Sequence, residues 1–297
     1  MSTALVTDST AYLPADLLEG LAVHVVPLHV VVGGTEHAEG VDIDPAAVAA
    51  ALRSFTPVST SRPAPAAFLA AYRAAAEAGA DAVVSVHISG DMSSTIGGAA
   101  IAAEESPVPV TVVDSRALGM AMGYAVLTGA RLAAGGASAA EVADAVRATC
   151  AASTVVFYVD TLEYLRRGGR IGTAGALVGS ALSIKPILGL RDGHIVPLER
   201  VRTSTRAIAR IEDLAVEAAT ALPSGSSGVD VAIHHLDSPE RAERLAEQLT
   251  ERLPGLRGEL YVSELGAAVG AHVGPGAVGV VVDPTPARDG APEPVED

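Results

Sequence analysis

Short runs of β-branched residues alternate along this chain with alanine-rich stretches, and this alternation constrains the fold more than any other feature. Several helical stretches carry start signals: Asp44-Pro45 places a capping side chain before a proline, and Ser138 with Glu141 forms a capping box. Strands that alternate with helices predict an α/β protein with mainly parallel pairing. The expected strands are Leu5–Asp8, Val23–Val32, Ala82–Ile88, Val110–Asp114, Thr154–Asp160, His194–Val201, Val229–Leu236, Glu259–Ser263 and Val278–Asp283.

The length of 297 residues favours two domains, at roughly 150 residues for each. We expect the first domain to span residues 1–152 and the second to span residues 153–285. A glycine-rich stretch near Arg166–Gly179 and a new set of strands mark the change. Residues 286–297 are acidic and rich in proline, and are expected to form a disordered tail.

Acidic residues outnumber basic ones by 35 to 20, so the formal net charge is −15. This balance argues against nucleic-acid binding, which needs clustered positive charge. Apolar residues make up 49% of the chain but aromatic residues only 3%, so much of the hydrophobicity is alanine. The longest weakly polar run, Ile171–Leu190, is interrupted by Lys185-Pro186 and falls short of the about 20 apolar residues of a membrane span. We therefore expect no membrane insertion.

The N-terminus lacks the basic and long apolar segments of a signal peptide. Cys150 is the only cysteine, and we expect it to be a buried structural thiol within a helix. Both features predict a cytoplasmic protein.

The usual catalytic motifs are missing from the sequence. There is no phosphate-binding G-x-x-x-x-G-K-[ST] loop, no G-x-S-x-G elbow and no histidine pair with metalloprotease spacing. With one cysteine, a zinc site is not expected, and neither is any other metal site. A formal G-x-G-x-x-G occurs at Gly274–Gly279, but a strand follows it where dinucleotide binding requires a helix. No catalytic residue is predicted.

Hydroxyl-rich segments instead follow the expected strands, at Thr7–Thr10, Ser89–Thr95 and Asp114-Ser115, and Ser59–Ser61 lies just before another expected helix. In an open α/β sheet, ligands bind at the carboxyl ends of the strands, so these segments should meet along one edge. Helix N-termini there favour an anion. The alternative is that these residues are ordinary helix caps.

A carboxylate suits these segments better than a triphosphate does. They hold few cations, with Arg62 and Arg116 the nearest, whereas a triphosphate normally recruits several basic residues and a metal. A carboxylate carries one charge and needs only a few neutral hydrogen-bond donors. Backbone amides can also bind phosphate without side chains, so phosphate stays open.

Two basic groups stand out in this acidic chain. Arg166, Arg167 and Arg170 lie beside two glycines on an expected turn, which favours a docking or phosphate-recognition point. The alternative is a helix C-terminus whose arginines offset the dipole. The second group is Arg200, Arg202, Arg206 and Arg210. Its last three members are spaced at four residues and would line one helical face if the helix began by Arg202.

The whole chain resembles the DegV family, the fatty-acid-binding subunits of bacterial fatty acid kinase. The resemblance rests on the order and spacing of several motifs, which cover almost the full length: Val6–Pro14 (VTDSTAYLP), Thr60–Pro65 (TSRPAP), Met92–Thr95 (MSST), Val112–Ser115 (VVDS), Asp160–Gly172 (DTLEYLRRGGRIG), Leu182–Leu188 (LSIKPIL) and His272–Ala277 (HVGPGA).

This resemblance implies two α/β domains, with a mainly parallel sheet in the first and a mixed sheet in the second. A ligand slot would lie at the carboxyl ends of the first-domain strands and between the domains. It implies that a long-chain fatty acid binds there and is presented to a separate ATP-dependent kinase subunit, which makes the acyl phosphate. The apolar tunnel would use residues of the Gly172–Leu190 stretch: Leu177, Val178, Leu182, Ile184, Ile187 and Leu188.

Carried over to this sequence, the resemblance implies that Thr60 and Ser93 bond the carboxylate. Ser61 and the backbone of Ser94 would lie beside them, and His272 would complete the head-group network. No cofactor is implied beyond the bound lipid. The residues expected to face the kinase are Arg166, Arg167, Arg170 and Arg202.

Two other functions remain open at this stage. Ser93 with His272 as its base could form a serine-dependent hydrolase or acyltransferase. A regulatory protein that senses lipid supply would use the same pocket without a kinase.

Overall fold

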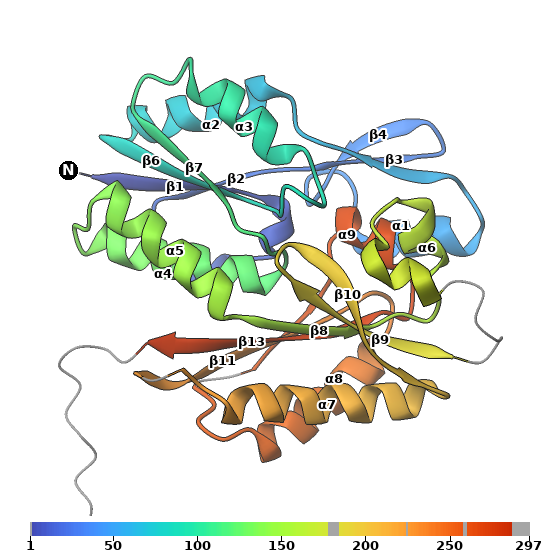
Figure 1. Cartoon of the computed structure of the whole chain (residues 1–297). Coiled ribbons are helices and arrows are strands. Elements are labelled where there is room, and N and C mark those ends of the chain that lie inside the picture. The colour runs from blue at the N-terminus through green and yellow to red at the C-terminus, as the bar shows by residue number, and fades with distance from the viewer. Residues whose placement is uncertain (1, 178–183, 224, 258–259, 287–297) are drawn as a thin grey trace, which may run out of the picture.

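Two β-sheets lie one above the other with a pair of helices between them, as Figure 1 shows. This computed structural model describes residues 2–177, 184–223, 225–257 and 260–286. The expected disordered tail lies outside the described residues apart from Pro286, which belongs to a strand. The α/β class with a parallel first sheet and a mixed second sheet is confirmed.

The first sheet is parallel throughout, in the order β2-β1-β6-β7. Helices α2 (Pro65–Glu77) and α3 (Thr95–Ala103) cover its outer face. The strands alternate with helices along the chain, as parallel pairing requires. Their bounds are β1 (Thr3–Asp8), β2 (Val23–Val26), β6 (Ala82–His87) and β7 (Val110–Asp114).

Helices α4 (Met120–Ala134) and α5 (Ala139–Ala152) lie between the two sheets, where both of their faces must pack. A Cβ atom at Gly129 would lie 2.8 Å from Val146 and 3.0 Å from Leu5, so only glycine fits this close approach. One core cluster contains Leu5 of the first sheet and Val281 of the second. The small residues that dominate the composition therefore serve this tight stacking.

The second sheet is mixed, in the order β10-β9-β8-β13-β11-β12, and only β11 and β12 are parallel. Helices α7 (Ser204–Thr220) and α8 (Pro239–Arg252) cover its outer face. Its strands are β8 (Thr154–Tyr158), β9 (Lys185–Arg191), β10 (His194–Val201), β11 (Ser226–His235), β12 (Tyr261–Glu264) and β13 (Val278–Pro286).

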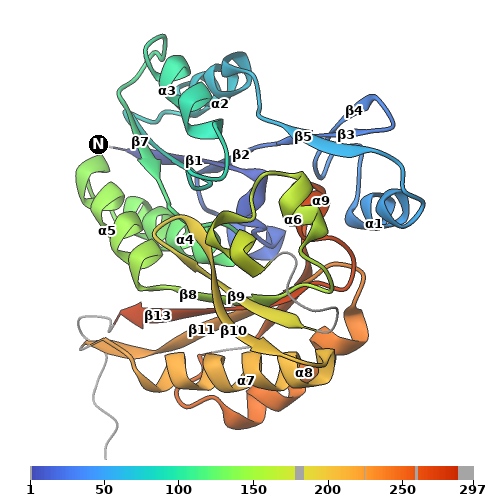
Figure 2. The same ribbon diagram turned by 45° about the vertical axis from the view of Figure 1, so that its right-hand side comes forward.

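A small antiparallel sheet of order β4-β3-β5 extends from the first sheet (Figure 2). Together with α1 (Pro45–Arg53) it packs against the short helix α9 (Ala267–Val273). Its strands are β3 (His29–Val32), β4 (Thr35–Ala38) and β5 (Val58–Ser61). The remaining elements are α6 (Glu163–Arg167) and three 3-10 helices, η1 (Ser9–Ala11), η2 (Ala15–Leu18) and η3 (Gly172–Leu177).

The structure departs from the sequence analysis at three places. The single strand expected over Val23–Val32 is two strands in different sheets, because Pro27 separates them and has no N–H for a ladder. Helix α7 begins at Ser204 with Thr203 as its cap, so Arg202 lies before the helix. Part of the Gly172–Leu190 stretch, which was expected to supply a tunnel, forms strand β9.

Of the residues expected in that tunnel, Ile187 and Leu188 are buried within the sheet, and they do not line the pocket described below; nor do Leu177 and Ile184. Leu190, at the end of the same stretch, does line it. Val178 and Leu182 lie outside the described residues. Cys150 lies in α5 as expected but is only half-buried, and burial raises the pKa of its thiol to about 12.

Within the described residues, none of the helices combines the length and apolar character needed to cross a membrane. The same part of the chain holds no group of three or more histidine, cysteine or acidic side chains arranged to bind a metal ion.

Candidate functional site

A deep pocket lies where the first sheet, the second sheet and α9 meet. It encloses about 970 Å³ of space free of atoms, part of it open to solvent. Of its twenty-five lining residues, nineteen are apolar or glycine. The polar ones are Thr10, Thr60, Ser93, Arg170, His234 and His272.

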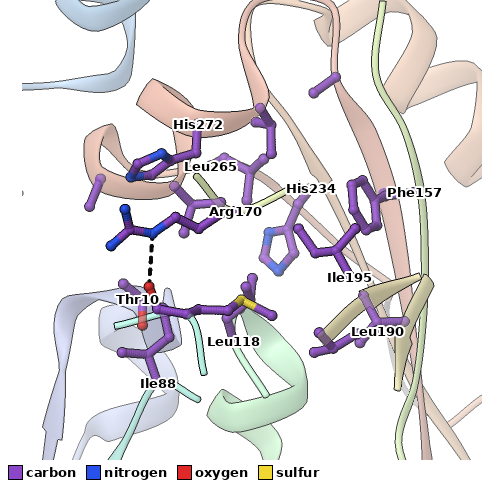
Figure 3. A pocket seen from close by; sticks show the side chains of 18 of the residues that line it. Thr10, Ile88, Leu118, Phe157, Arg170, Leu190, Ile195, His234, Leu265 and His272 are labelled. Carbon is purple, nitrogen blue, oxygen red and sulfur yellow. Dashed lines mark hydrogen bonds between the residues drawn. The ribbon is translucent and has the colours of Figure 1, made fainter. Parts of the chain in front are cut away.

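Four of these polar residues gather at one end. Thr60 Oγ1 of β5 lies 2.9 Å from His272 Nε2 of α9, and Arg170 Nε donates to the Met92 carbonyl at 2.9 Å. Ser93 follows Met92 in the same loop, and its Oγ lies 2.8 Å from Thr95 Oγ1. Figure 3 shows Arg170 and His272 on one side of the cavity and Phe157, Leu190 and Ile195 on the other.

His272 is held neutral in this setting. Burial is the main cause, and the positive charge of Arg170 adds to it, so that the pKa of His272 falls to about 4. A Cβ atom at Gly168 would overlap the His272 imidazole, which explains why glycine follows Arg166-Arg167. A negative group bound here would meet hydroxyls, an imidazole and a guanidinium, a set that can hold a single carboxylate.

The other two polar residues direct their polar atoms into the protein. Thr10 Oγ1 donates to Asp8 at 2.5 Å. The Met120 N–H donates to His234 Nε2 at 3.1 Å, so the proton lies on Nδ1, which donates to Ser263 Oγ at 3.0 Å. Burial lowers the pKa of His234 to about 4, with the neighbouring His235 adding to the effect. The middle and far parts of the pocket are therefore apolar in character.

The structure separates the residues that the sequence analysis grouped together. Thr60, Ser93 and His272 line the pocket, as does Arg170, which was expected to face a partner. Thr60 lies on strand β5, which was not among the expected strands. Ser61 points elsewhere, with its Oγ donating to Glu36 at 2.9 Å, and Ser94 is exposed at the start of α3.

The expected docking arginines are exposed but not equally free. Arg166 and Arg167 both pair with Glu163, at 2.7 Å in each case, and their hydrogen bonds lower the pKa of that carboxyl to about 2. Arg202 is exposed on the loop before α7. Arg170 combines an exposed position with a guanidinium that reaches the pocket, so its charge bears on any ligand inside.

A buried network near the pocket has the connectivity of a serine-hydrolase triad and was missed from the sequence. Asp8 Oδ2 lies 3.1 Å from His87 Nδ1, and His87 Nε2 lies 2.7 Å from Ser85 Oγ. All three residues are fully buried, and the Tyr72 hydroxyl lies 2.9 Å from Ser85 Oγ. A substrate has no access to this serine. Asp8 also accepts from the Ile88 N–H, so the network shapes the pocket wall.

Comparison with known proteins identifies the family. Residues 2–285 match the family model described as "Uncharacterised protein, DegV family". The chain belongs to the DegV family. The DegV domain-containing protein SCO2569 from Streptomyces coelicolor is 50% identical over 279 residues, which cover 94% of this chain and 97% of that protein.

Two solved DegV structures superpose over nearly the whole chain. The first, described as fatty acid binding of a DegV family protein from Thermus thermophilus, has a TM-score of 0.88 at 35% identity and covers 96% of this chain and 100% of its own. The second, DegV from Bacillus subtilis, is described as a fatty acid binding protein. It has a TM-score of 0.85 at 32% identity over the same shares.

Proposed function

We propose that this DegV family protein binds one long-chain fatty acid, with the carboxylate at the polar end of the pocket and the tail along the apolar walls. One observation carries the proposal: Thr60, Ser93, His272 and Arg170 gather at one end of a cavity. Its other lining residues are apolar, apart from Thr10 and His234, whose polar atoms bond within the protein. Fatty acid binding by the Thermus and Bacillus relatives supports it.

Thr60 and Ser93 would donate hydrogen bonds to the carboxylate, each worth roughly 1.5–3 kcal/mol because one partner is charged. His272 and Arg170 would complete the head-group site. The Ser94 backbone would lie beside Ser93 in this site. The Ser61 hydroxyl would not take part, because it bonds Glu36. A tail of about 16 carbons contributes on the order of 12 kcal/mol before binding costs, so the tail supplies most of the affinity.

We further propose that the protein, in the cytoplasm, presents the bound carboxylate to a separate ATP-dependent kinase subunit that forms the acyl phosphate. The missing nucleotide motifs support this division, because the partner would hold ATP and this chain would need no cofactor of its own. Arg166, Arg167 and Arg202 are exposed and would face the kinase, with Arg170 at the opening of the pocket.

Native mass spectrometry of protein purified from a bacterial host tests lipid binding. We expect an added mass equal to that of a palmitate- or oleate-sized acid, and a protein stripped of lipid should take up added palmitate. A clean protein mass together with no uptake would overturn the proposal.

The docking surface needs its own test. Replacing both Arg167 and Arg202 with alanine should leave palmitate retention unchanged and reduce phosphorylation by the kinase subunit. Arg147→Ala, an exposed arginine of α5 paired with Asp144, is the matched control. Equal phosphorylation of both variants would remove these arginines from the proposed interface.

A serine-dependent hydrolase using Ser93 and His272 is the second candidate. Its residues do lie in one pocket, but Ser93 Oγ pairs with Thr95 and His272 Nε2 pairs with Thr60. A serine-directed fluorophosphonate should therefore leave Ser93 unlabelled, and labelling would favour the hydrolase. A lipid-sensing regulator would bind the same acids. Co-purification with a kinase would distinguish the kinase subunit from such a regulator.

A further inference from the structure

The β9–β10 hairpin forms one wall of the pocket and extends beyond the second sheet. Leu190 and Ile195 are cross-strand partners at its end, and both line the pocket. The turn between the strands, Asp192-Gly193, has both residues in the left-handed region, as a tight two-residue hairpin requires. Pairing of β9 with β8 runs only from Ile187 to Gly189, so the end of the hairpin needs support from elsewhere.

That support comes from the first half of the chain. Ser89 Oγ donates to the Gly193 carbonyl at 2.9 Å, and Arg116 Nη2 donates to the Asp192 carbonyl at 2.7 Å. His194 Nε2 lies 3.4 Å from Asp91 Oδ2 at the same place. A Cβ atom at Gly193 would overlap Ser89 Oγ, so the two loops are in direct contact.

Ser89 also organises the loop that carries the head-group residues. The Ser89 carbonyl accepts from the backbone N–H groups of Met92 and Ser93, each at 3.0 Å, and Ser89 itself is fully buried. Met92 and Ser93 line the pocket, and the Met92 carbonyl binds Arg170. One residue therefore holds both the polar end of the pocket and the hairpin that covers the far end.

We infer that Ser89 is a positioning residue for lipid retention: its hydroxyl fastens the β9–β10 hairpin over the acyl tail and couples that wall to the head-group loop. The inference rests on the proposed function. A bound tail would pack against Leu190 and Ile195, so it can leave more readily whenever the hairpin end moves away. Removing the Ser89 hydroxyl leaves the Gly193 carbonyl without this donor and favours that movement.

The test compares Ser89→Ala with Ser115→Ala. Ser115 is a matched control, since it is also buried and its hydroxyl bonds only the amide and carbonyl of Ala117 in its own loop. Each protein is loaded with radiolabelled palmitate, and release into excess unlabelled palmitate is followed over time. Ser89→Ala should release palmitate about tenfold faster than wild type, and Ser115→Ala should stay within about twofold.

A second readout separates positioning from a general loss of stability. Both substitutions should lower the melting temperature by similar amounts, since each removes one buried hydroxyl. Backbone amides of the hairpin end, residues 191–195, should exchange hydrogen faster in Ser89→Ala alone. Equal release rates or equal exchange in the two variants would overturn the inference. If the wild type retains no palmitate, the proposed function fails instead.

Variants on the hairpin side keep the inference open to refutation even if Ser89→Ala fails to fold. Gly193→Ala should accelerate release, since its new methyl group displaces the Ser89 hydroxyl at a left-handed position. Arg116→Ala, which removes the second contact, should accelerate release by about threefold. Where Ser89→Ala folds, the double variant with Gly193→Ala should release no faster than the faster single variant. The inference would be contradicted if the two accelerations multiplied in the double variant, or if Arg116→Ala released palmitate at the wild-type rate.

Discussion

The two ends of the pocket are held in different ways. At the polar end, Thr60 and His272 are fixed by a hydrogen bond and by the close approach of Gly168 to the imidazole. At the far end, Phe157, Leu190 and Ile195 are apolar, and the hydrogen bonds that hold the hairpin there lie at its turn, Asp192-Gly193, which does not line the cavity. Directional contacts can select a carboxylate and orient it, whereas apolar walls increase affinity with the length of tail that they cover. The difference predicts that affinity and orientation can be changed separately.

The largest effect should come from a charge placed in the apolar end. Ile195→Asp would bury a carboxylate without a partner against the bound tail, and palmitate affinity should fall by about a hundredfold or more. Ile101→Asp, at an exposed isoleucine of α3, should leave affinity within about twofold. Titration of lipid-free protein with palmitate measures both. Comparable affinities would mean that the tail does not lie along the hairpin.

Removing one hydroxyl from the polar end should cost less. Thr60→Ala and Ser93→Ala should each weaken palmitate binding by about tenfold or more, because a hydrogen bond to a charged group is lost. Ser61→Ala, next to Thr60 but bonded to Glu36, should bind as the wild type does. The same titration, with melting temperatures measured in parallel, checks these values. Losses of melting temperature that matched the losses of affinity would mark Ser93 as a helix cap only.

Arg170 should contribute less to palmitate affinity than the two hydroxyls do. Its guanidinium borders the pocket but is partly exposed, so Arg170→Ala should weaken palmitate binding by about fivefold. Arg166→Ala, which removes only an exposed pair with Glu163, should leave binding unchanged. If Arg170→Ala binds normally but is phosphorylated poorly, the residue acts in docking alone.

The smallest effect should be a change in protonation at His272. A bound carboxylate offsets the charge of Arg170 and favours the imidazolium, so the pKa of His272 should rise from about 4 when palmitate binds. His234 is the internal control, since its nitrogens bond Met120 and Ser263 and its pKa of about 4 should not move. NMR titration of the two imidazoles, with and without palmitate, measures both.

The sign of the pH dependence follows from the same values. In the lipid-free protein His272 protonates near pH 4, whereas in the unfolded chain it protonates near pH 6.5. Its contribution to the free energy of unfolding is therefore complete above pH 6.5 and is lost as the pH falls toward 4. The contribution of Asp283 to the free energy of unfolding has the opposite pH dependence, because burial raises its pKa to about 7. If the NMR titration showed the same pKa of His272 with and without palmitate, the bound carboxylate would lie away from His272.

The order of helices and strands was largely readable from the sequence. Strands such as Ala82–His87 and Val110–Asp114 follow from local runs of β-branched residues, and the capping box at Ser138 marks the start of α5 where it was expected. Hydropathy patterns and caps are local signals, so they can be recognised in the sequence without knowledge of the fold. The hydroxyl-rich segments also drew attention to Thr60 and Ser93.

The meeting of those segments in space could not be read in the same way. Thr60 and His272 are 212 positions apart, and the triad-like network joins Asp8 to His87 across two parallel strands. Arg170 looked like a surface charge beside Arg166 and Arg167, and only the turn after α6 directs it toward Met92.

The acidic, alanine-rich sequence was enough to establish the α/β class and to predict an anion site made of hydroxyls and a few clustered arginines. Tertiary structure decided which of those hydroxyls face one cavity, which arginine joins them and how Ser89 fastens the hairpin across it. The reason is physical: secondary structure follows from neighbours in the chain, whereas the direction of a side chain into a pocket is set by packing between segments that are distant in sequence.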